Sequence, residues 1–586
     1  MTSIPPPSSK DEYYNLGTYT RPIKTSNPEA QTWFNRGLIW TYAFNHEEAA
    51  KCFQNAIAHD PICALAHWGL AYTLGPNYNK PWQFFDEVEL AETIRRTHEA
   101  ASTAKELASS NQYSKSTVEK ALIDAVQHRY PQSKPPQPAS LRGEQDGKPE
   151  TETEADACSA WNKGYSDAMH AAYIGFPDDL DVAALYADAL MNLTPWALWD
   201  LRTGEPAPGA RTLEVKSVLD CALAQPGGLH HPGLLHLYIH LMEMSGAPEK
   251  ALVVADHLRG LVPDAGHLNH MPTHLDILCG DYRRAISSNS EAIRSDERFV
   301  ARAGPVNFYT LYRAHNYHFR IYAAMFAGQS RVALETAAEL ERQIPEELLR
   351  IESPPMADWL EGFLAMRVHV LVRFGRWDDL IALDVPHDAN IYAVSMAMVH
   401  YGRGVALAAT GRIDEAVASQ TCFEEAYKNV PASRMLFNNT CIDILAIASA
   451  MLAGELEYRR GNVNEAFAHL RRSIALDDSL PYDEPWGWMQ PTRHAYGALL
   501  LEQGQVEEAA AVYAADLGID DTLPRALQHP NNIWALHGYH ECLVRLGRSA
   551  EANIVKGQLK FAAATADVQI EASCFCRRGP TGCHAA

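Results

Sequence analysis

Apolar residues recur along this chain at helical intervals, and the strict alternation of apolar and polar residues that is typical of half-buried strands is nearly absent. The segment WFNRGLIWTYAFNHEEAAKCFQNAIAHDP, residues 33–61, shows the pattern clearly, because two helical stretches flank a short turn. An apolar helix face has to be buried against a neighbouring element. The pattern therefore predicts an all-α protein.

Residues 33–61 also carry the signature of a repeat. Small residues at Gly37 and Ala49 allow two helices to approach closely, large rings fill the space between hairpins, and Pro61 ends the second helix. This spacing is similar to that of a tetratricopeptide repeat. Weaker copies, each with a turn glycine five residues before an alanine, begin at Gly280, Gly411, Gly461 and Gly504. We expect a tetratricopeptide-repeat-like superhelix of helical hairpins, an α-solenoid, with interrupted repeats.

Composition suggests how the chain is divided. Residues 131–157, PQSKPPQPASLRGEQDGKPETETEADA, are rich in Pro, Gln, Glu and Thr and nearly lack large apolar residues, so they cannot bury enough surface to fold. A Cys-rich tail at the end of the chain is expected to be dispensable for folding. The predicted parts are a flexible segment (1–28), hairpins (29–130), a disordered or lid-like insertion (131–157), a histidine-rich central region (158–330), further hairpins (331–570) and the tail (571–586).

The charge balance narrows the classes of partner. The chain has 50 Lys and Arg against 72 Asp and Glu, a net charge of −22, which argues against a nucleic-acid partner. No apolar stretch is long enough to span a membrane, and no basic segment followed by an apolar run begins the sequence. Most of the eleven cysteines are scattered singly, as reduced thiols are. We expect a cytoplasmic protein that contacts neither nucleic acid nor membrane; a homo-oligomeric state stays open.

Histidines are concentrated in three segments, HHPGLLHLYIHLME, GHLNHMPTHLD and YRAHNYHFR. In the first segment, two histidines lie one helical turn apart and Glu243 shares their face. Pro272 suits the first turn of a helix, so His270 is expected before that helix and His274 within it. Together the segments offer seven candidate metal ligands: His236, His240, His267, His270, His274, His315 and His318.

Imidazoles at positions i and i+4 of a helix can converge on one metal ion, and successive hairpins of a solenoid could bring the three segments together. Few carboxylates lie nearby, which favours copper, with zinc or iron as alternatives and two ions conceivable. Glu243 could orient a histidine, bind the metal or act as a general base. The simpler interpretation is that these histidines are polar residues on half-buried helices.

Several stretches, among them YADALMNLTPW, HPGLLHLYIH, AGHLNHMPTHLDI and HNYHF, resemble a family of histidine-rich tetratricopeptide-repeat proteins of bacteria and fungi. The likeness covers most of the chain, although His67 and Asp276 depart from the family pattern. It implies a common fold and a common histidine site, but it supplies no activity. The matching positions are His46, His231, His236, His240, His267, His270, His274, His315 and His318.

The histidine clustering favours a metal-dependent enzyme that acts on a small organic substrate in the concave face of the superhelix. An oxidoreductase that uses copper or iron with dioxygen is the first interpretation, with Glu243 as the candidate catalytic residue. A zinc-dependent hydrolase or isomerase is the second. The third is a non-catalytic adaptor that binds other proteins through its repeats.

Overall fold

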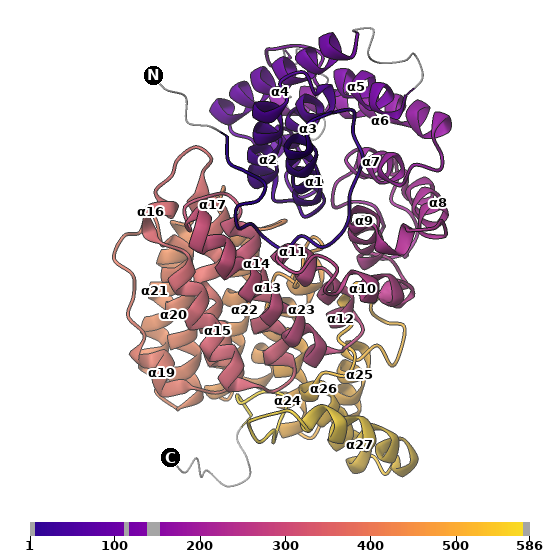
Figure 1. Cartoon of the computed structure of the whole chain (residues 1–586). Coiled ribbons are helices and arrows are strands. Elements are labelled where there is room, and N and C mark those ends of the chain that lie inside the picture. The colour runs from indigo at the N-terminus through magenta and orange to yellow at the C-terminus, as the bar shows by residue number, and fades with distance from the viewer. Residues whose placement is uncertain (1–5, 110–116, 137–152, 578–586) are drawn as a thin grey trace, which may run out of the picture. The chain divides into compact units, whose positions relative to one another are not determined.

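A computed structural model describes residues 6–109, 117–136 and 153–577. Its contacts divide the chain into two compact units: unit 1 comprises residues 1–245 and 250–272, and unit 2 comprises residues 246–249 and 273–586. Each unit is built of helices, and the described strands are two short ones in unit 2, β1 (Met435–Leu436) and β2 (Asn439–Thr440) (Figure 1). The predicted all-α fold is therefore confirmed.

Unit 1 is a succession of helices in which chain neighbours pack on one another and α9 returns to pack on α1. The helices are α1 (Pro28–Tyr42), α2 (His46–His59), α3 (Ala64–Leu74), α4 (Glu87–Ala108), α5 (Val118–Arg129), α6 (Glu154–Gly175), α7 (Leu180–Met191), α8 (Thr212–Leu223), α9 (Pro232–Glu243), α10 (Leu252–Leu258) and α11 (Gly266–His270).

The first hairpin, α1 and α2, is held by the ring of Phe53. A Cβ atom added at Gly37 of α1 would lie 2.9 Å from this ring, and one added at Gly69 of α3 would lie 2.4 Å from it. Phe53 itself is fully buried. Glycine is therefore needed on both neighbouring helices, and the predicted role of Gly37 is confirmed.

Unit 2 contains the remaining helices, and the chain passes from unit 1 into unit 2 within α12. They are α12 (Pro272–Leu278), α13 (Tyr282–Ala303), α14 (Thr310–Phe326), α15 (Ser330–Gln343), α16 (Glu346–Leu349), α17 (Met356–Leu360), α18 (Met366–Arg373), α19 (Trp377–Ala382), α20 (Ala393–Ala409), α21 (Ile413–Lys428), α22 (Cys441–Arg459), α23 (Val463–Asp478), α24 (Thr492–Glu502), α25 (Val506–Asp516), α26 (Ile533–Arg545) and α27 (Ser549–Ala563).

The hairpin turns of unit 2 share one backbone motif. Between α20 and α21, Gly411 has φ +85°, its N–H bonds to the carbonyl of Ala408 at 3.0 Å, and the N–H of Arg412 bonds to the carbonyl of Leu407 at 2.8 Å. This is the Schellman ending of a helix, in which the left-handed residue is usually glycine. The same hydrogen-bond pattern recurs at Gly280, Gly328, Gly375, Gly461, Gly504 and Gly547.

The N-terminal segment differs from the prediction that residues 1–28 are flexible. Within residues 6–27, Leu16 and Ile23 are buried and Arg21 forms ion pairs with Asp179 and Asp181. The backbone N–H of Asn15 also donates to Asp264 at 2.7 Å. Buried apolar residues and partly buried ion pairs therefore hold this segment on unit 1, although it has no regular secondary structure.

The predicted insertion, residues 131–157, extends too far toward the C-terminus. Helix α6 already begins at Glu154, because Thr153 and Asp156 form a reciprocal capping box at its first turn. Residues 137–152 lie outside the described residues. Within the described part of the chain, no helix is both long enough and apolar enough to cross a membrane.

The tail also differs from prediction where the structure describes it. Cys576 is buried in the core of unit 2, the ring of Phe575 lies 6.0 Å from that of Trp534, and Arg577 donates to Glu541 at 2.6 Å. Cys574 and Cys576 form a disulfide. Residues 573–577 are thus part of the fold rather than a frayed end, and Cys583 lies outside the described residues.

We expect Phe575→Ala to lower the free energy of unfolding by about 2 kcal/mol, because a half-buried ring that packs on Trp534 is lost. Thermal and urea unfolding of the full chain would measure the change. Lys556→Ala, an exposed substitution on α27, is the control and should unfold like the wild type. If wild type, Phe575→Ala and Lys556→Ala unfold with equal free energy, the tail is dispensable for stability, as the sequence predicted.

Candidate metal centre

Two of the predicted ligands lie on α9, a helix whose residues are all buried. Pro232 occupies its first turn, and the Nδ1 atom of His231 accepts a hydrogen bond from the backbone N–H of Leu234 at the N-terminus. His236 and His240 follow one turn apart, so both imidazoles leave the same side of the helix. The helical spacing predicted for this segment is confirmed.

Each of these imidazoles has one nitrogen held by an acceptor. The Nδ1 atom of His236 donates to the backbone carbonyl of Tyr42 at 2.6 Å. The Nδ1 atom of His240 donates to the Oε1 atom of Glu243 at 2.8 Å. Protons on both Nδ1 atoms leave the lone pairs on the Nε2 atoms, which is the tautomer that a metal ligand requires.

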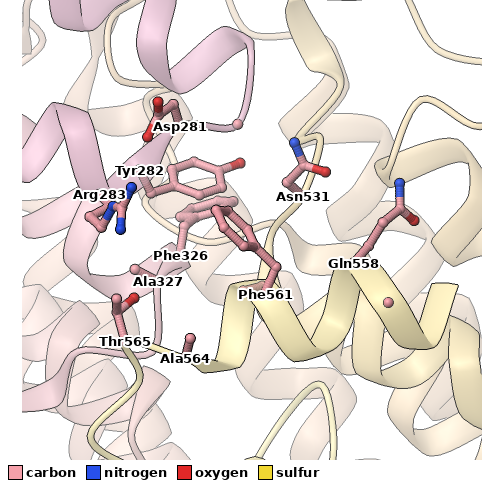
Figure 2. Close-up of a pocket in the computed structure, with 13 residues that line it drawn as sticks. Asp281, Tyr282, Arg283, Phe326, Ala327, Asn531, Gln558, Phe561, Ala564 and Thr565 are labelled. Carbon is pink, nitrogen blue, oxygen red and sulfur yellow. The ribbon is translucent and has the colours of Figure 1, made fainter.

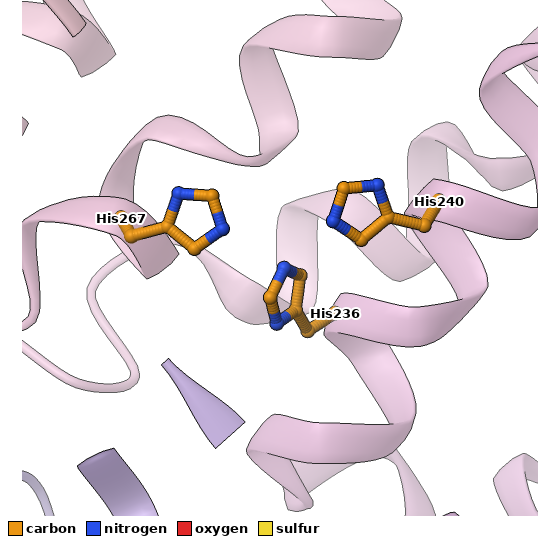
Figure 3. A group of neighbouring side chains, drawn as sticks. All are labelled: His236, His240 and His267. Atoms are coloured by element: carbon orange, nitrogen blue, oxygen red, sulfur yellow. The ribbon is translucent and has the colours of Figure 1, made fainter. Parts of the chain in front are cut away.

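His267 completes the group from α11. Figure 3 shows the three imidazoles of His236, His240 and His267 turned toward a common space. One ligand atom from each residue lies within 4.8 Å of the others. All three side chains are at most 1% exposed. The structure thus brings three predicted ligands together in unit 1.

Aromatic rings enclose these imidazoles. The ring of Phe44 lies 4.4 Å from that of His236 and stacks on those of His240 and His267, both at 5.8 Å. The rings of Tyr78 and Trp196 lie 5.1 and 5.8 Å from that of His240. Such walls keep bulk water away and strengthen every electrostatic interaction inside.

A small cavity of about 20 Å³ borders the group, lined by residues that include His46, Tyr72, Asp188 and His236. This volume suffices for roughly one water molecule. Burial and the charge of Arg129 together lower the pKa of His46 to about 3, so this imidazole is neutral at physiological pH.

The buried carboxylate of Asp181 fixes several side chains next to the histidine group. Its carboxylate accepts hydrogen bonds from Tyr19 at 2.7 Å, from Tyr42, and from the Nε2 atom of His231 at 3.1 Å, and it forms an ion pair with Arg21. Burial alone would raise the pKa of Asp181, but the hydrogen bond from His231 and the charge of Arg21 outweigh it and hold the pKa below its usual range. Tyr42, whose carbonyl holds His236, is therefore itself fixed through its hydroxyl.

The remaining predicted ligands are one further histidine of unit 1 and three histidines of unit 2. His270 is on α11, with its ring 5.8 Å from that of His267. His274 lies on α12 and His315 and His318 lie on α14, all in unit 2, so the predicted place of His274 within a helix is confirmed. The ring of His274 lies 5.6 Å from that of His315. Whether any of these residues binds a metal stays a prediction.

The unit 2 cluster also contains two partners that the sequence did not reveal. His274 forms an ion pair with Glu484, and the Nε2 atom of His318 lies 2.8 Å from the Sδ atom of Met489. Burial lowers the pKa of His318 to about 3, assisted by the charge of nearby His369. Glu484 and Met489 lie in the segment DEPWGWMQP, which attracts attention in the sequence only through its tryptophans.

A separate pocket of about 360 Å³ opens on unit 2 between α13, α14 and α27. In Figure 2 the rings of Tyr282, Phe326 and Phe561 lie close together, with Asn531 and Gln558 beside them. Phe561 is 76% exposed. This pocket is open and largely apolar, unlike the enclosed histidine group of unit 1.

We expect Asp181→Asn to destabilise the protein by about 3 kcal/mol at pH 7, because the partly buried Arg21 and the buried His231 lose their charged partner. The carboxylate has a lowered pKa in the folded state, so its contribution to the free energy of unfolding is fully present above the unfolded-state pKa of about 3.9. This contribution is lost as the pH falls below that value toward the folded-state pKa. Urea unfolding should therefore show a difference between wild type and variant that shrinks as the pH falls from about 5 toward 3. A constant difference across this range would contradict the assignment.

Comparison with known proteins supports the repeat. The family of tetratricopeptide repeats matches residues 30–63, the α1–α2 hairpin. No curated protein sequence is similar enough to count as a relative. The chain therefore carries a tetratricopeptide repeat, as its sequence predicted, within an all-α fold rich in buried histidines.

Similar solved structures include the APC/C hetero-tetramer Cut9–Hcn1 (14% identity, 86% of this chain and 77% of that chain, TM-score 0.30). Two others are yeast Tom70 (12%, 91% and 92%, 0.28) and a human IFIT1 dimer with m7Gppp-AAAA (10%, 92% and 92%, 0.31). Likeness at this level carries no argument about what the chain does.

Proposed function

We propose that unit 1 holds a transition metal ion between His236, His240 and His267, and that this ion makes the chain a metal-dependent enzyme. The observation that carries the proposal is the pair of hydrogen bonds to the Nδ1 atoms, one to the Tyr42 carbonyl and one to the Glu243 carboxylate. Metal-binding histidines characteristically donate their second N–H to a carbonyl or carboxylate, which fixes the ring and raises its basicity.

The number of donors supports a catalytic rather than a purely structural ion. Structural zinc sites commonly use four protein ligands, whereas catalytic sites use three and leave a position for water or substrate. Glu243 holds the Nδ1 proton of His240, so we assign it a positioning role. Its carboxylate could also take up a proton near the metal, as the sequence suggested, because it is fully buried beside the ligands.

The donor set favours copper and accommodates zinc. Neutral imidazoles bind both ions, and a nitrogen site of given geometry binds copper most tightly among the first-row divalent metals. Bound copper would supply redox chemistry with dioxygen, and bound zinc would supply an activated water molecule. The bordering cavity of about 20 Å³ fits a ligand the size of one water molecule, and a larger organic substrate would require the walls of the cavity to move.

We expect His240→Ala to lower the bound metal at least about tenfold, because one of three ligands is removed. Metal content after loading with copper or zinc would be measured by inductively coupled plasma mass spectrometry, with far-ultraviolet circular dichroism as the check of folding. His257→Ala, which removes an exposed histidine from unit 1, should keep the full metal content. Equal metal in both variants would contradict the ligand assignment.

Because His240→Ala also leaves the Glu243 carboxylate without its imidazole partner, His240→Gln serves as a second variant. The amide of glutamine can still donate to Glu243, and it is a poor ligand for copper or zinc. A folded His240→Gln protein that keeps its metal would equally refute the proposal.

We expect Glu243→Gln to weaken metal binding by about 10- to 100-fold without removing a ligand. The amide keeps the size of the carboxylate but stabilises the Nδ1 proton of His240 less well. Competition titration of metal-free protein with a chelator would measure the dissociation constant. An unchanged constant would show that Glu243 does not orient His240.

A non-catalytic adaptor is the second candidate function. The tetratricopeptide repeat suggests a scaffold for protein interaction, and the open pocket with the exposed ring of Phe561 favours a surface that binds another molecule. A wild-type protein that purifies without metal and takes up none of copper, zinc or iron would leave the adaptor as the better interpretation.

A further inference from the structure

The turn between α1 and α2 has the same hydrogen bonds as the hairpin turns of unit 2. The N–H of Phe44 bonds to the carbonyl of Thr41 at 3.1 Å, and the N–H of Asn45 bonds to the carbonyl of Trp40 at 3.1 Å. Phe44 also precedes Ala49 by five residues, as Gly411 precedes Ala416. Phe44 therefore stands where the other turns have glycine.

The backbone at this position is left-handed, with φ +54° at Phe44. A residue with a Cβ atom is destabilised in this conformation, which is why the left-handed residue that follows a helix is usually glycine. At Gly461, Gly504 and Gly547 nothing lies within 4 Å of an added Cβ atom. Backbone conformation, and not crowding, therefore selects glycine in those turns, and Phe44 adopts the same conformation against that preference.

The side chain of Phe44 explains what the strained backbone achieves. From the tip of the first hairpin its ring reaches the imidazoles of α9 and α11, at 4.4 Å from His236 and 5.8 Å from both His240 and His267. A buried ring that only filled the core could stand on a helix, where no strain is needed. Strained backbone is retained mainly where the surroundings fix it for a functional purpose.

Trp196 supports this interpretation independently. It too is left-handed, with φ +58°, and its ring meets that of His240 edge-on at 5.8 Å. Two aromatic residues with unfavourable backbone conformations thus border the same imidazole.

We infer that Phe44 is a positioning residue of the metal centre, held in a left-handed turn so that its ring orients all three histidines and keeps water from them. The inference rests on the proposed function. Its role is to keep the Nε2 atoms of α9 converged with His267 before the metal arrives. Phe44 contacts the three proposed ligands and has no donor atom of its own, so its loss would weaken binding without removing a ligand.

The test compares Phe44→Gly, Phe44→Ala and Phe44→Leu in the full chain. All three should bind copper(II) and zinc(II) about tenfold or more weakly than wild type in chelator competition, because the stacked ring is gone. In the metal-free state Phe44→Gly should melt at a higher temperature than Phe44→Ala. Alanine normally stabilises a folded protein more than glycine does, and the order is reversed here because only glycine relieves the strain of the left-handed backbone.

Asn531→Gly is the matched control, since Asn531 is left-handed at φ +59° in unit 2 and lies in the open pocket. It should leave metal affinity unchanged. If wild type binds metal and the Phe44 variants bind it equally well, the inference is overturned while the proposed function stands. If wild type binds none of the offered metals, the proposed function fails and the inference fails with it.

Discussion

The hydrogen bond from the imidazole of His236 to the carbonyl of Tyr42 is the contact on which the candidate centre depends. Tyr42 is the last residue of α1, and the final carbonyls of a helix have no partner within it. The fold satisfies one of these carbonyls with an imidazole from α9. The same bond fixes the tautomer of His236 and joins the repeat hairpin to the histidine helix. Asp181 fixes the hydroxyl of Tyr42, the residue that accepts this bond. Phe44, two residues after Tyr42, packs its ring on the imidazole of His236, the residue that donates it.

The parts of the structure that follow from local sequence were predictable. Helical periodicity gives the all-α fold, and the i, i+4 spacing places His236 and His240 on one side of α9. The N-terminal segment was not, because its order comes from ion pairs with Asp179 and Asp181, which are remote in sequence. The Tyr42 carbonyl leaves no sequence signal at all, since every residue has one. The sequence does contain a signal for Phe44, because this hairpin turn lacks the glycine that the other turns have. The signal is recognised only when the turns are compared with one another.

Strain is not scattered at random through the described residues. Four non-glycine residues there are left-handed, and three of them are aromatic: Phe44, Trp196 and Phe437. The first two border the histidines of unit 1, and the ring of Phe437 lies 4.6 Å from that of His315 in unit 2. The helical hairpins supply the stability that such positions reduce. The two units thus place left-handed aromatic residues beside different groups of histidines, and in unit 2 the thioether of Met489 lies beside His318.

The contacts of the segment before α1 affect the order in which unit 1 folds. Residues 6–27 precede α1 along the chain, yet their partners include Asp181 on α7 and Asp264 just before α11. Contacts so distant along the chain form slowly, because the loop between them has to close before the contact stabilises anything. His267 follows Asp264 by three residues. Docking of residues 6–27 is therefore complete only once Asp264 has been synthesised, three residues before the last of the three converging histidines, so that this docking and the assembly of the histidine group end in one late event.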